Sequence, residues 1–467
     1  MEEQNSAMEN KSHLGEKATY RGLLTKSFPS ILMMIAVSVY SLFDGFFVSN
    51  YGGSTQFAAV NFVYPVIMLI GTIGFMMGSG GAALVAKKFG EGDIKRGNAY
   101  FFLCVLSCTV LGIVLSTITY IFLPQILLFM KADEAMLPYC IEYGRILCIG
   151  VTFFNLQNLF QNFFNVAENP RLGFIVTVGA GISNIAFDAI FVAGLGMGIV
   201  GAAIGTVIGQ VLGGLLPLLY FCKRNKSPLL LRPGIFALRP ILRMMGNGLS
   251  EFITNAAVSI LTIFINALLM DYYGENGVSA YGVIAYLWLI FAATFIGFSM
   301  SVCPKISYQF GAKNKEELSS LLRKSLLLYL GFGVIEVILA ESLAYPICYA
   351  YVGYDQALFD LTIYAFRIYG LSYLFLGISM FGSAFFTALN NALVSCLISV
   401  GRLFVIELLL LELLPLGLGG DGIWISFVIS QPIETIVVLI LMAAFSNKYG
   451  YSLIHRKKKD GEEGQEA

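Results

Sequence analysis

Acidic and amide side chains inside apolar stretches are the residues of this sequence that could do chemistry. Asp44 lies among apolar residues in SVYSLFDGFFV. In ISNIAFDAIFV, Asn184 and Asp188 are four residues apart, which places both side chains on one face of a helix. Thr206 follows in GAAIGTVIGQ, where small residues allow close helix packing.

If these three segments meet, two carboxylates share one cavity. Like charges in a low dielectric favour keeping a proton on one of them, so the pair could carry a proton. The same carboxylate, amide and hydroxyl oxygens could instead coordinate sodium, because hard cations prefer oxygen ligands. Structural interpretations stay open beside these. Asp44 could form an ion pair with an arginine or stay hydrated near the surface, and Asn184 and Asp188 could serve helix packing alone.

The stretch FFNLQNLFQNFFN at 153–165 places six amides in an apolar segment. An amide that faces lipid is unsatisfied at a cost of several kcal/mol, so these must face protein or a wet cavity. The equivalent stretch of the second half, GISMFGSAFFT, is much less polar. We therefore expect substrate to bind in the first half or the central cleft, against Tyr40, Gln157, Asn158 and Gln161. The alternative is that the amides hydrogen-bond between helices and hold them together.

The second half also carries acids in apolar stretches. Glu251, in GLSEFITN, and Glu407 form a candidate second cation site. For several of the others, a position near the end of a stretch makes a hydrated acid an equal alternative; the set comprises Glu336, Glu341, Glu412 and Glu434.

Catalysis has little support. The two histidines, His13 and His455, lie in the tails, which excludes a histidine-dependent triad within the apolar segments. The sequence has no phosphate-binding GxxxxGK[ST] motif, and its eight cysteines lack metal-site spacing. We expect no enzyme, no metal and no cofactor apart from a coupling ion, H⁺ or Na⁺.

Composition indicates that these residues sit in a membrane. Hydrophobic residues make up 57% of the 467 and charged residues 12%, with a mean hydropathy of +0.77. Apolar runs long enough to cross the hydrocarbon core recur about twelve times. Because the runs are continuous rather than alternating, strands are excluded. The predicted fold is an all-α polytopic membrane protein with about 12 transmembrane helices in two pseudo-symmetric six-helix lobes.

The two lobes are predicted from an internal repeat. KKFGEGDIKRGN in the first half matches YQFGAKNKEELS in the second, which places Gly90 opposite Gly311. Duplicated halves are common in transporters. The expected organisation is, in order, an N-terminal tail (1–25), an N-lobe with spans 1–6 (26–222), a basic connector (223–245), a C-lobe with spans 7–12 (246–446) and a C-terminal tail (447–467).

Positive charge predicts the orientation. Most of the 29 Lys and Arg residues lie in the tails, the loop at 87–98, the connector and the stretch at 305–324. Positive residues stay cytoplasmic, so both termini and the connector are expected inside. Topology and contact with anionic lipids account for the basic residues, and we expect no nucleic acid partner.

Taken together, the pattern resembles the multidrug and toxic compound extrusion (MATE) family, in its DinF-like and MepA-like branches. The resemblance covers roughly residues 20–446 and depends on FDGFFVSNYGGSTQFAAVNFVYP, MGSGGAALVAKKFGEGD and ISNIAFDAIFVAGLGMGIVGAAIGTVIGQ in this order. It implies a monomeric transporter of the bacterial plasma (inner) membrane. Such a protein exports amphipathic, often cationic, drugs or toxic metabolites in exchange for protons or sodium.

The resemblance also implies roles for residues. In the DinF-like branch the N-lobe cation site matches Asp44, Asn184, Asp188 and Thr206, and a bend-forming proline of the first span matches Pro29. The NorM-like branch uses a C-lobe site with a Glu on the seventh span, matched by Glu251, and an Asp on the tenth span, which this sequence lacks.

Three other functions are alternatives to export. A lipid-linked oligosaccharide or lipid flippase of the same superfamily would share the two lobes but usually has a cationic central cavity, for which only Arg145 and Arg367 are candidates here. A major-facilitator transporter would carry a DRxGRR-like loop, which KKFGEGDIKRGN does not match. A channel would show no saturable exchange.

Overall fold

The structure, a computed structural model, describes residues 14–48, 51, 53–130, 132–223, 225, 227–234 and 237–453; the side chains of residues 41, 42, 44–46, 53, 54 and 57 are outside the description. Within these ranges the chain is helical and contains no strand. Helices satisfy all their backbone hydrogen bonds internally, which a lipid environment requires. The prediction of an all-α membrane protein is confirmed.

The N-lobe consists of six spans. They are α2 (Tyr20–Phe47), α3 (Gly53–Gly90), α4 (Ile94–Phe129), α5 (Leu137–Val166), α6 (Pro170–Asp188), which continues into the π-helical turn η2 (Ala189–Gly194), and α7 (Gly198–Cys222).

The C-lobe consists of six further spans, several of them interrupted. They are formed by α8 (Leu238–Gly311), α9 (Lys315–Val352), α10 (Gln356–Gly370), α11 (Tyr373–Ala388), α12 (Ala392–Val400), the π-helical turn η3 (Gly401–Glu407), α13 (Leu408–Leu418) and α14 (Asp421–Tyr449).

The described residues form twelve spans, as predicted. By length and apolar composition, ten helices of the described chain could cross a membrane, or eleven when α10 and α11, bent by 53°, are taken as one span. The 74-residue helix α8 contains two spans, because Gly274 breaks it with φ 62° and ψ −151°. That left-handed backbone favours glycine, and it reverses the chain between spans seven and eight.

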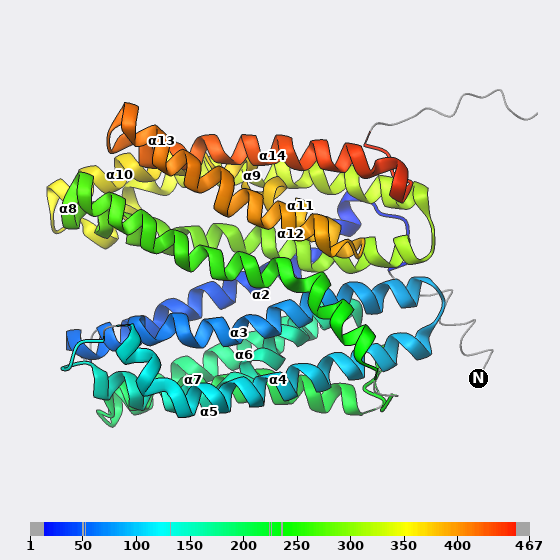
Figure 1. Ribbon diagram of the computed structural model, residues 1–467, viewed down its shortest axis with the longest axis horizontal. Coiled ribbons are helices and arrows are strands. Elements are labelled where there is room, and N and C mark those ends of the chain that lie inside the picture. Colours follow the sequence, from blue (N-terminus) through cyan, green and yellow to red (C-terminus); the bar gives the residue numbers. More distant parts are fainter. Residues whose placement is uncertain are drawn as a thin grey trace, which may run out of the picture.

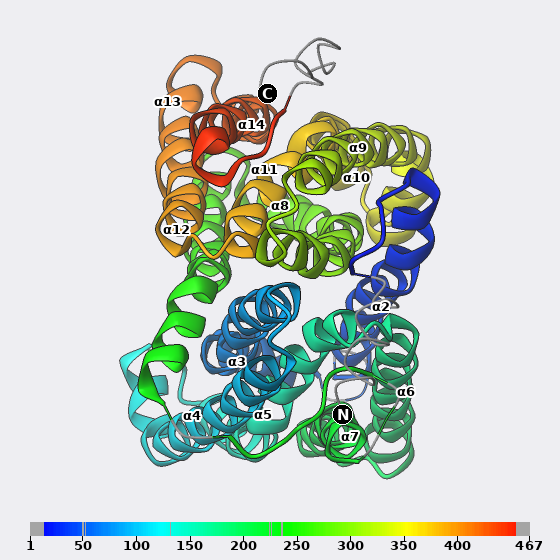
Figure 2. The same ribbon diagram turned by 90° about the vertical axis from the view of Figure 1, so that its right-hand side faces the viewer.

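The spans form two bundles. Figure 1 shows α3–α7 in one bundle and α9–α14 with most of α8 in the other, and Figure 2 shows the same bundles nearly end-on. The start of α8 lies beside α4 of the N-lobe. α2 likewise crosses between the lobes, because it begins beside the C-lobe and ends in the N-lobe (Figure 1). The beginning of α2 and the end of α14 lie at the same end of the molecule, which we call the terminal end (Figure 1).

Each lobe has its own apolar core. In the N-lobe, Phe101 packs against Phe163 with ring centroids 4.6 Å apart and against Phe221 at 5.2 Å. In the C-lobe, the buried ring of Tyr329 lies 4.8 Å from that of Phe381. Separate cores allow the lobes to move as units.

Glycines bring the lobes into direct backbone contact. A Cβ on Gly248 of α8 would overlap the carbonyl oxygen of Met76 in α3. A Cβ on Gly297, also of α8, would lie 2.6 Å from the carbonyl oxygen of Ser30 in α2. Small residues permit this approach of helix backbones in membranes. These contacts lie in the half of the molecule nearer the terminal end, so the lobes are packed together there.

Candidate functional site

The predicted N-lobe cation residues meet where α6 passes into η2. Asp188 ends α6 and is fully buried, and Asn184 lies one turn earlier on the same face. Asn184 Nδ2 donates to Asp188 Oδ2 at 3.4 Å and to Thr206 Oγ1 of α7 at 3.5 Å. The structure therefore brings together three of the four residues, next to a π-helical turn, a feature often found at functional sites.

Small residues of α7 allow it to approach this group closely. A Cβ on Gly205 would overlap Asp188 Oδ1, and a Cβ on Gly209 would lie 3.1 Å from Asn184 Cβ. The result is a carboxylate, an amide and a hydroxyl packed in an apolar setting. This set of atoms can take up a proton or supply oxygen ligands to a hard cation.

Asp44 lies in α2, three residues before the helix ends, and its side chain is outside the described residues. The residue one turn before it is Tyr40, whose ring packs on α6: a Cβ on Gly181 would lie 2.6 Å from Tyr40 Cδ1. Asn184 follows Gly181 by three residues. The face of α2 that carries Tyr40 is therefore directed at the part of α6 that leads to the cation residues.

Pro29 lies inside α2, nine residues after the helix begins. Its ring removes one backbone hydrogen bond, and the helix nevertheless continues to Phe47. The next residue, Ser30, is fully buried and donates from Oγ to Asn165 Oδ1 of α5 at 2.8 Å. The position suits a hinge because the backbone ladder is weak there while the adjoining side chain is anchored.

Two amides of the 153–165 stretch hold helices together. Asn155 Oδ1 accepts a hydrogen bond from the backbone N–H of Gly74 in α3 at 2.8 Å. Asn165 receives the bond from Ser30. For these residues the interpretation as interhelical hydrogen bonding is correct.

The amides predicted to contact substrate are differently placed. Gln157 packs on α7, where a Cβ on Gly213 would lie 2.6 Å from its Cδ. Asn158 is 4% exposed, and its Nδ2 has no hydrogen-bond partner among the described residues. Gln161 is equally enclosed at 3% exposed. A buried donor of this kind carries a free-energy cost unless a ligand or water accepts its hydrogen bond.

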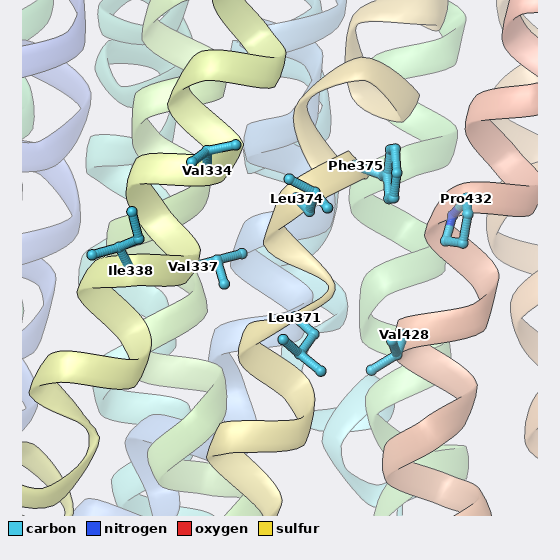
Figure 3. A pocket seen from close by; sticks show the side chains of 8 residues that line it. All are labelled: Val334, Val337, Ile338, Leu371, Leu374, Phe375, Val428 and Pro432. Atoms are coloured by element: carbon cyan, nitrogen blue, oxygen red, sulfur yellow. The ribbon is translucent and has the colours of Figure 1, made fainter.

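Two cavities of the described chain lie away from these side chains. One, of about 310 Å³, opens between α9, the bend from α10 to α11, and α14, and its lining is apolar, as Figure 3 shows for Val337, Leu374 and Phe375. The other, of about 280 Å³, lies between α4 and α5 around Ser116 and Thr152. Neither is lined by the predicted substrate residues.

In the C-lobe, Glu407 lies in a cluster with Arg402 and Glu434. Arg402 Nε is 4.0 Å from Glu434 Oε2, and all three side chains are buried. Glu407 Oε1 and both carboxylate oxygens of Glu434 have no hydrogen-bond partner within the described part of the chain. Glu251 of α8 is half-buried and its charge also interacts with that of Arg402. The positive charge of one buried arginine thus interacts with several carboxylates.

The sequence did not reveal the pairing of Arg402 with Glu434 or its proximity to Glu407. Residues 402 and 407 are five apart, which places them on different faces of an α-helix with 3.6 residues per turn. Both lie in η3, where the i→i+5 hydrogen bonding of a π-helix brings such residues nearly one above the other. A charged residue five positions from an acid inside a span was the available signal.

Comparison with known proteins places this geometry in a family. The MatE family model matches residues 29–190 and 252–411, once in each half. "Multidrug export protein MepA" of Staphylococcus aureus (strain NCTC 8325 / PS 47) is 21% identical over 432 residues, 91% of this chain and 93% of the relative.

Solved structures share the fold. One described as the outward-facing conformation of a multidrug resistance MATE family transporter of the MOP superfamily has a TM-score of 0.88 and 21% identity, covering 93% of this chain and 97% of that one. Another, described as MATE in the straight conformation, has a TM-score of 0.87 and 21% identity, covering 93% and 98%.

The family matches span well over half of the chain, and the twelve-helix, two-lobe fold agrees with the solved structures. The resemblance noted in the sequence is confirmed, as is the expectation of a transporter rather than an enzyme. This chain belongs to the MATE family of multi-pass membrane transporters.

Proposed function

We propose that the protein is a secondary active exporter of amphipathic, often cationic, drugs or toxic metabolites, which it exchanges for protons or sodium ions by alternating access. The observation that carries this proposal is the buried group of Asn184, Asp188 and Thr206, because an ionisable residue inside a membrane span is expensive to keep unless it has a function. Its relatives' designation as multidrug export proteins supports the class of substrate.

The coupling step uses two carboxylates. Asp44 follows Tyr40 by one turn of α2, and Tyr40 contacts α6 just before Asn184, so we infer that Asp44 and Asp188 act as a pair. Two like charges at close range in a low dielectric retain one proton or bind one cation between them. The free energy available for transport is about 1.4 kcal/mol per proton for each pH unit of gradient. The membrane potential adds roughly 2.3 kcal/mol per charge per 100 mV.

Substrate binds against the neighbouring buried amides. Tyr40 supplies an aromatic face, and Gln157, Asn158 and Gln161 supply uncharged hydrogen-bonding groups that tolerate varied shapes. The unpaired Asn158 Nδ2 supports this, because a substrate acceptor would satisfy it. Cation and drug then favour opposite states of the lobe, and exchange follows from that difference.

Bending of α2 at Pro29 links the two events. The charge state of the Asp44–Asp188 pair selects a straight or a bent first span, and Ser30 fixes the pivot by its bond to Asn165. The loss of one backbone hydrogen bond at Pro29 lowers the cost of bending there.

Glu251 and Glu407 form a second cation site of this proposal, with Arg402 and Glu434 as its charged neighbours. The chain works as a monomer in the bacterial inner membrane among its lipids, with both termini cytoplasmic, since positive residues gather at the terminal end. The flippase alternative is not favoured, because the relatives are designated multidrug export proteins and one of the two candidate arginines, Arg367, is paired with Glu341.

Purified protein in liposomes, loaded with the fluorescent monocation ethidium, tests the proposal under pH and sodium gradients imposed separately. Saturable ethidium movement driven by one of the gradients supports exchange. Ethidium movement that responds to neither gradient contradicts it.

A further inference from the structure

A short segment before the first span, Leu14–Thr19, is attached to the C-lobe although it precedes an N-lobe helix in sequence. We call it the N-terminal strap. The carbonyl oxygen of Leu14 accepts a hydrogen bond from Gln309 Nε2 of α8 at 3.0 Å. Ala18 is 3% exposed and belongs, with Leu23 of α2, to the apolar core of the C-lobe.

Two charged residues of α9 hold both backbone groups of one strap residue. The N–H of Ala18 donates to Glu317 Oε1, and its carbonyl oxygen accepts from Lys324 Nζ. Lys324 also lies 5.9 Å from the centroid of the Tyr20 ring, at the first residue of α2. Hydrogen bonds that involve a charged group are the stronger kind, so this end of α2 is firmly fixed.

The link from the strap to the N-lobe is weak by comparison. The N–H of Leu14 lies 3.5 Å from Glu168 Oε1, in the connection between α5 and α6. This distance exceeds that of a good hydrogen bond. The strap therefore belongs to the C-lobe and only touches the N-lobe.

Beyond Pro29 the attachment of α2 changes. Ser30 bonds to Asn165 of the N-lobe and Tyr40 packs on Gly181 of α6, while Ser38 Oγ keeps one bond to the carbonyl oxygen of Leu289 in α8, at 3.0 Å. Figure 1 shows the same transition, with α2 beginning beside the C-lobe and ending in the N-lobe. One helix thus has its two ends in different lobes, with a proline between them.

We propose that Glu317 and Lys324 clamp the start of α2 to the C-lobe, so that bending of α2 at Pro29 turns one lobe against the other. A bend in a helix with a free end would move only that end. With the end clamped, the same bend must displace the lobe to which it is attached. The two residues position α2 and do not touch cation or drug; the inference rests on the proposed function and adds the part that transmits the motion.

Substitutions in the first turn of α9 separate this role from a merely structural one. Glu316 and Glu317 both place a carboxylate there, but Glu316 is exposed and Glu317 is buried against Ala18. Glu316→Ala and Glu317→Ala therefore remove the same favourable charge from the helix N-terminus. Glu317→Gln keeps an oxygen that accepts from the Ala18 N–H. For Lys324, the variant is Lys324→Met and the control is the neighbouring Arg323→Met.

The first readout compares ethidium binding to detergent-purified protein with gradient-driven ethidium transport in liposomes. We expect Glu317→Ala and Lys324→Met to lower transport about tenfold or more, while the Kd for ethidium stays within about twofold of wild type. Glu316→Ala, Arg323→Met and Glu317→Gln should transport normally. The clamp is wrong if Glu317→Ala transports like wild type, or if its binding falls in parallel with its transport.

The second readout does not depend on transport. Spin labels at exposed positions 171 in the N-lobe and 313 in the C-lobe, with Cys222, Cys303 and Cys396 replaced by serine, report the distance between the lobes at the terminal end. A change of pH or sodium should shift this distance in the parent protein and in Glu316→Ala but not in Glu317→Ala. An equal shift in all three contradicts the clamp but leaves cation coupling intact. No shift in the parent contradicts both.

Discussion

Gly90 of α3 and Gly311 of α8 each pack against the other's helix. A Cβ on Gly90 would overlap the carbonyl oxygen of Tyr308, and a Cβ on Gly311 would overlap that of Lys87. The two glycines hold equivalent places in the sequence repeat, so the contact is reciprocal, as at a two-fold axis. It closes the lobes against each other at the terminal end.

Alanine at Gly90 or Gly311 should therefore impair transport. Overpacking against backbone costs about 1–3 kcal/mol, which disfavours the packed arrangement by roughly 5- to 150-fold. Gradient-driven ethidium transport per amount of purified protein should fall accordingly. Gly246→Ala is the control in α8, because a Cβ there meets nothing within 4 Å. Equal transport by Gly311→Ala and Gly246→Ala would show that close packing at this contact is not needed.

The buried amides divide into two groups with different expected phenotypes. Asn155→Ala removes the hydrogen bond from α3 to α5 at Gly74, so stability should fall by about 0.5–1.5 kcal/mol, seen as lower expression and melting temperature. Gln157→Ala and Gln161→Ala should instead change the relative transport of different drugs at normal expression. If Gln157→Ala and Gln161→Ala lower only the protein level, these two amides hold helices together as Asn155 does.

Arg402 offers a test of the C-lobe cluster. Arg402→Met leaves the buried carboxylate of Glu434 without its cation, which costs about 3–5 kcal/mol. The melting temperature in detergent should drop, and Arg402→Met combined with Glu434→Gln should recover most of the loss. An unchanged melting temperature in Arg402→Met would mean that Glu434 is already protonated.

The hinge predicts a kinetic effect. Pro29→Ala restores a backbone hydrogen bond in α2 and stiffens it, so turnover should slow while ethidium binding is retained. Transport rates and ethidium binding measured on the same preparation check this. A wild-type transport rate in Pro29→Ala would show that bending at Pro29 is not part of the transport mechanism.

The sequence predicted the parts of this structure that follow from regular periodicity. Twelve apolar runs became twelve spans because each run is long enough to cross the membrane as a helix. The four-residue spacing of Asn184 and Asp188 placed them on one face, as the structure has them.

Other parts of the structure correspond to no regular pattern in the sequence. Arg402 and Glu407 meet through a π-helical turn, which α-helical periodicity does not anticipate. The amides of Asn155 and Asn158 look alike in sequence, and the Nδ2 of each lacks a hydrogen-bond partner among the described residues; only the position of Gly74 gives Asn155 Oδ1 a bond to α3. The strap is too short to carry any pattern, and its role depends on contacts almost 300 residues away in sequence, such as that of Leu14 with Gln309.

The central claim is that Asp188, with Asp44, couples a cation gradient to export. The most direct measurement is pH- and sodium-gradient-driven ethidium transport in liposomes by Asp188→Asn, Asp44→Asn and the double variant. Each is nearly isosteric with wild type, so folding should persist. We predict that every one transports no faster than protein-free liposomes while still binding ethidium, and that the double variant is no worse than either single one. Normal gradient-driven transport by Asp188→Asn, with its loss in Glu251→Gln, would place coupling in the C-lobe and contradict the account.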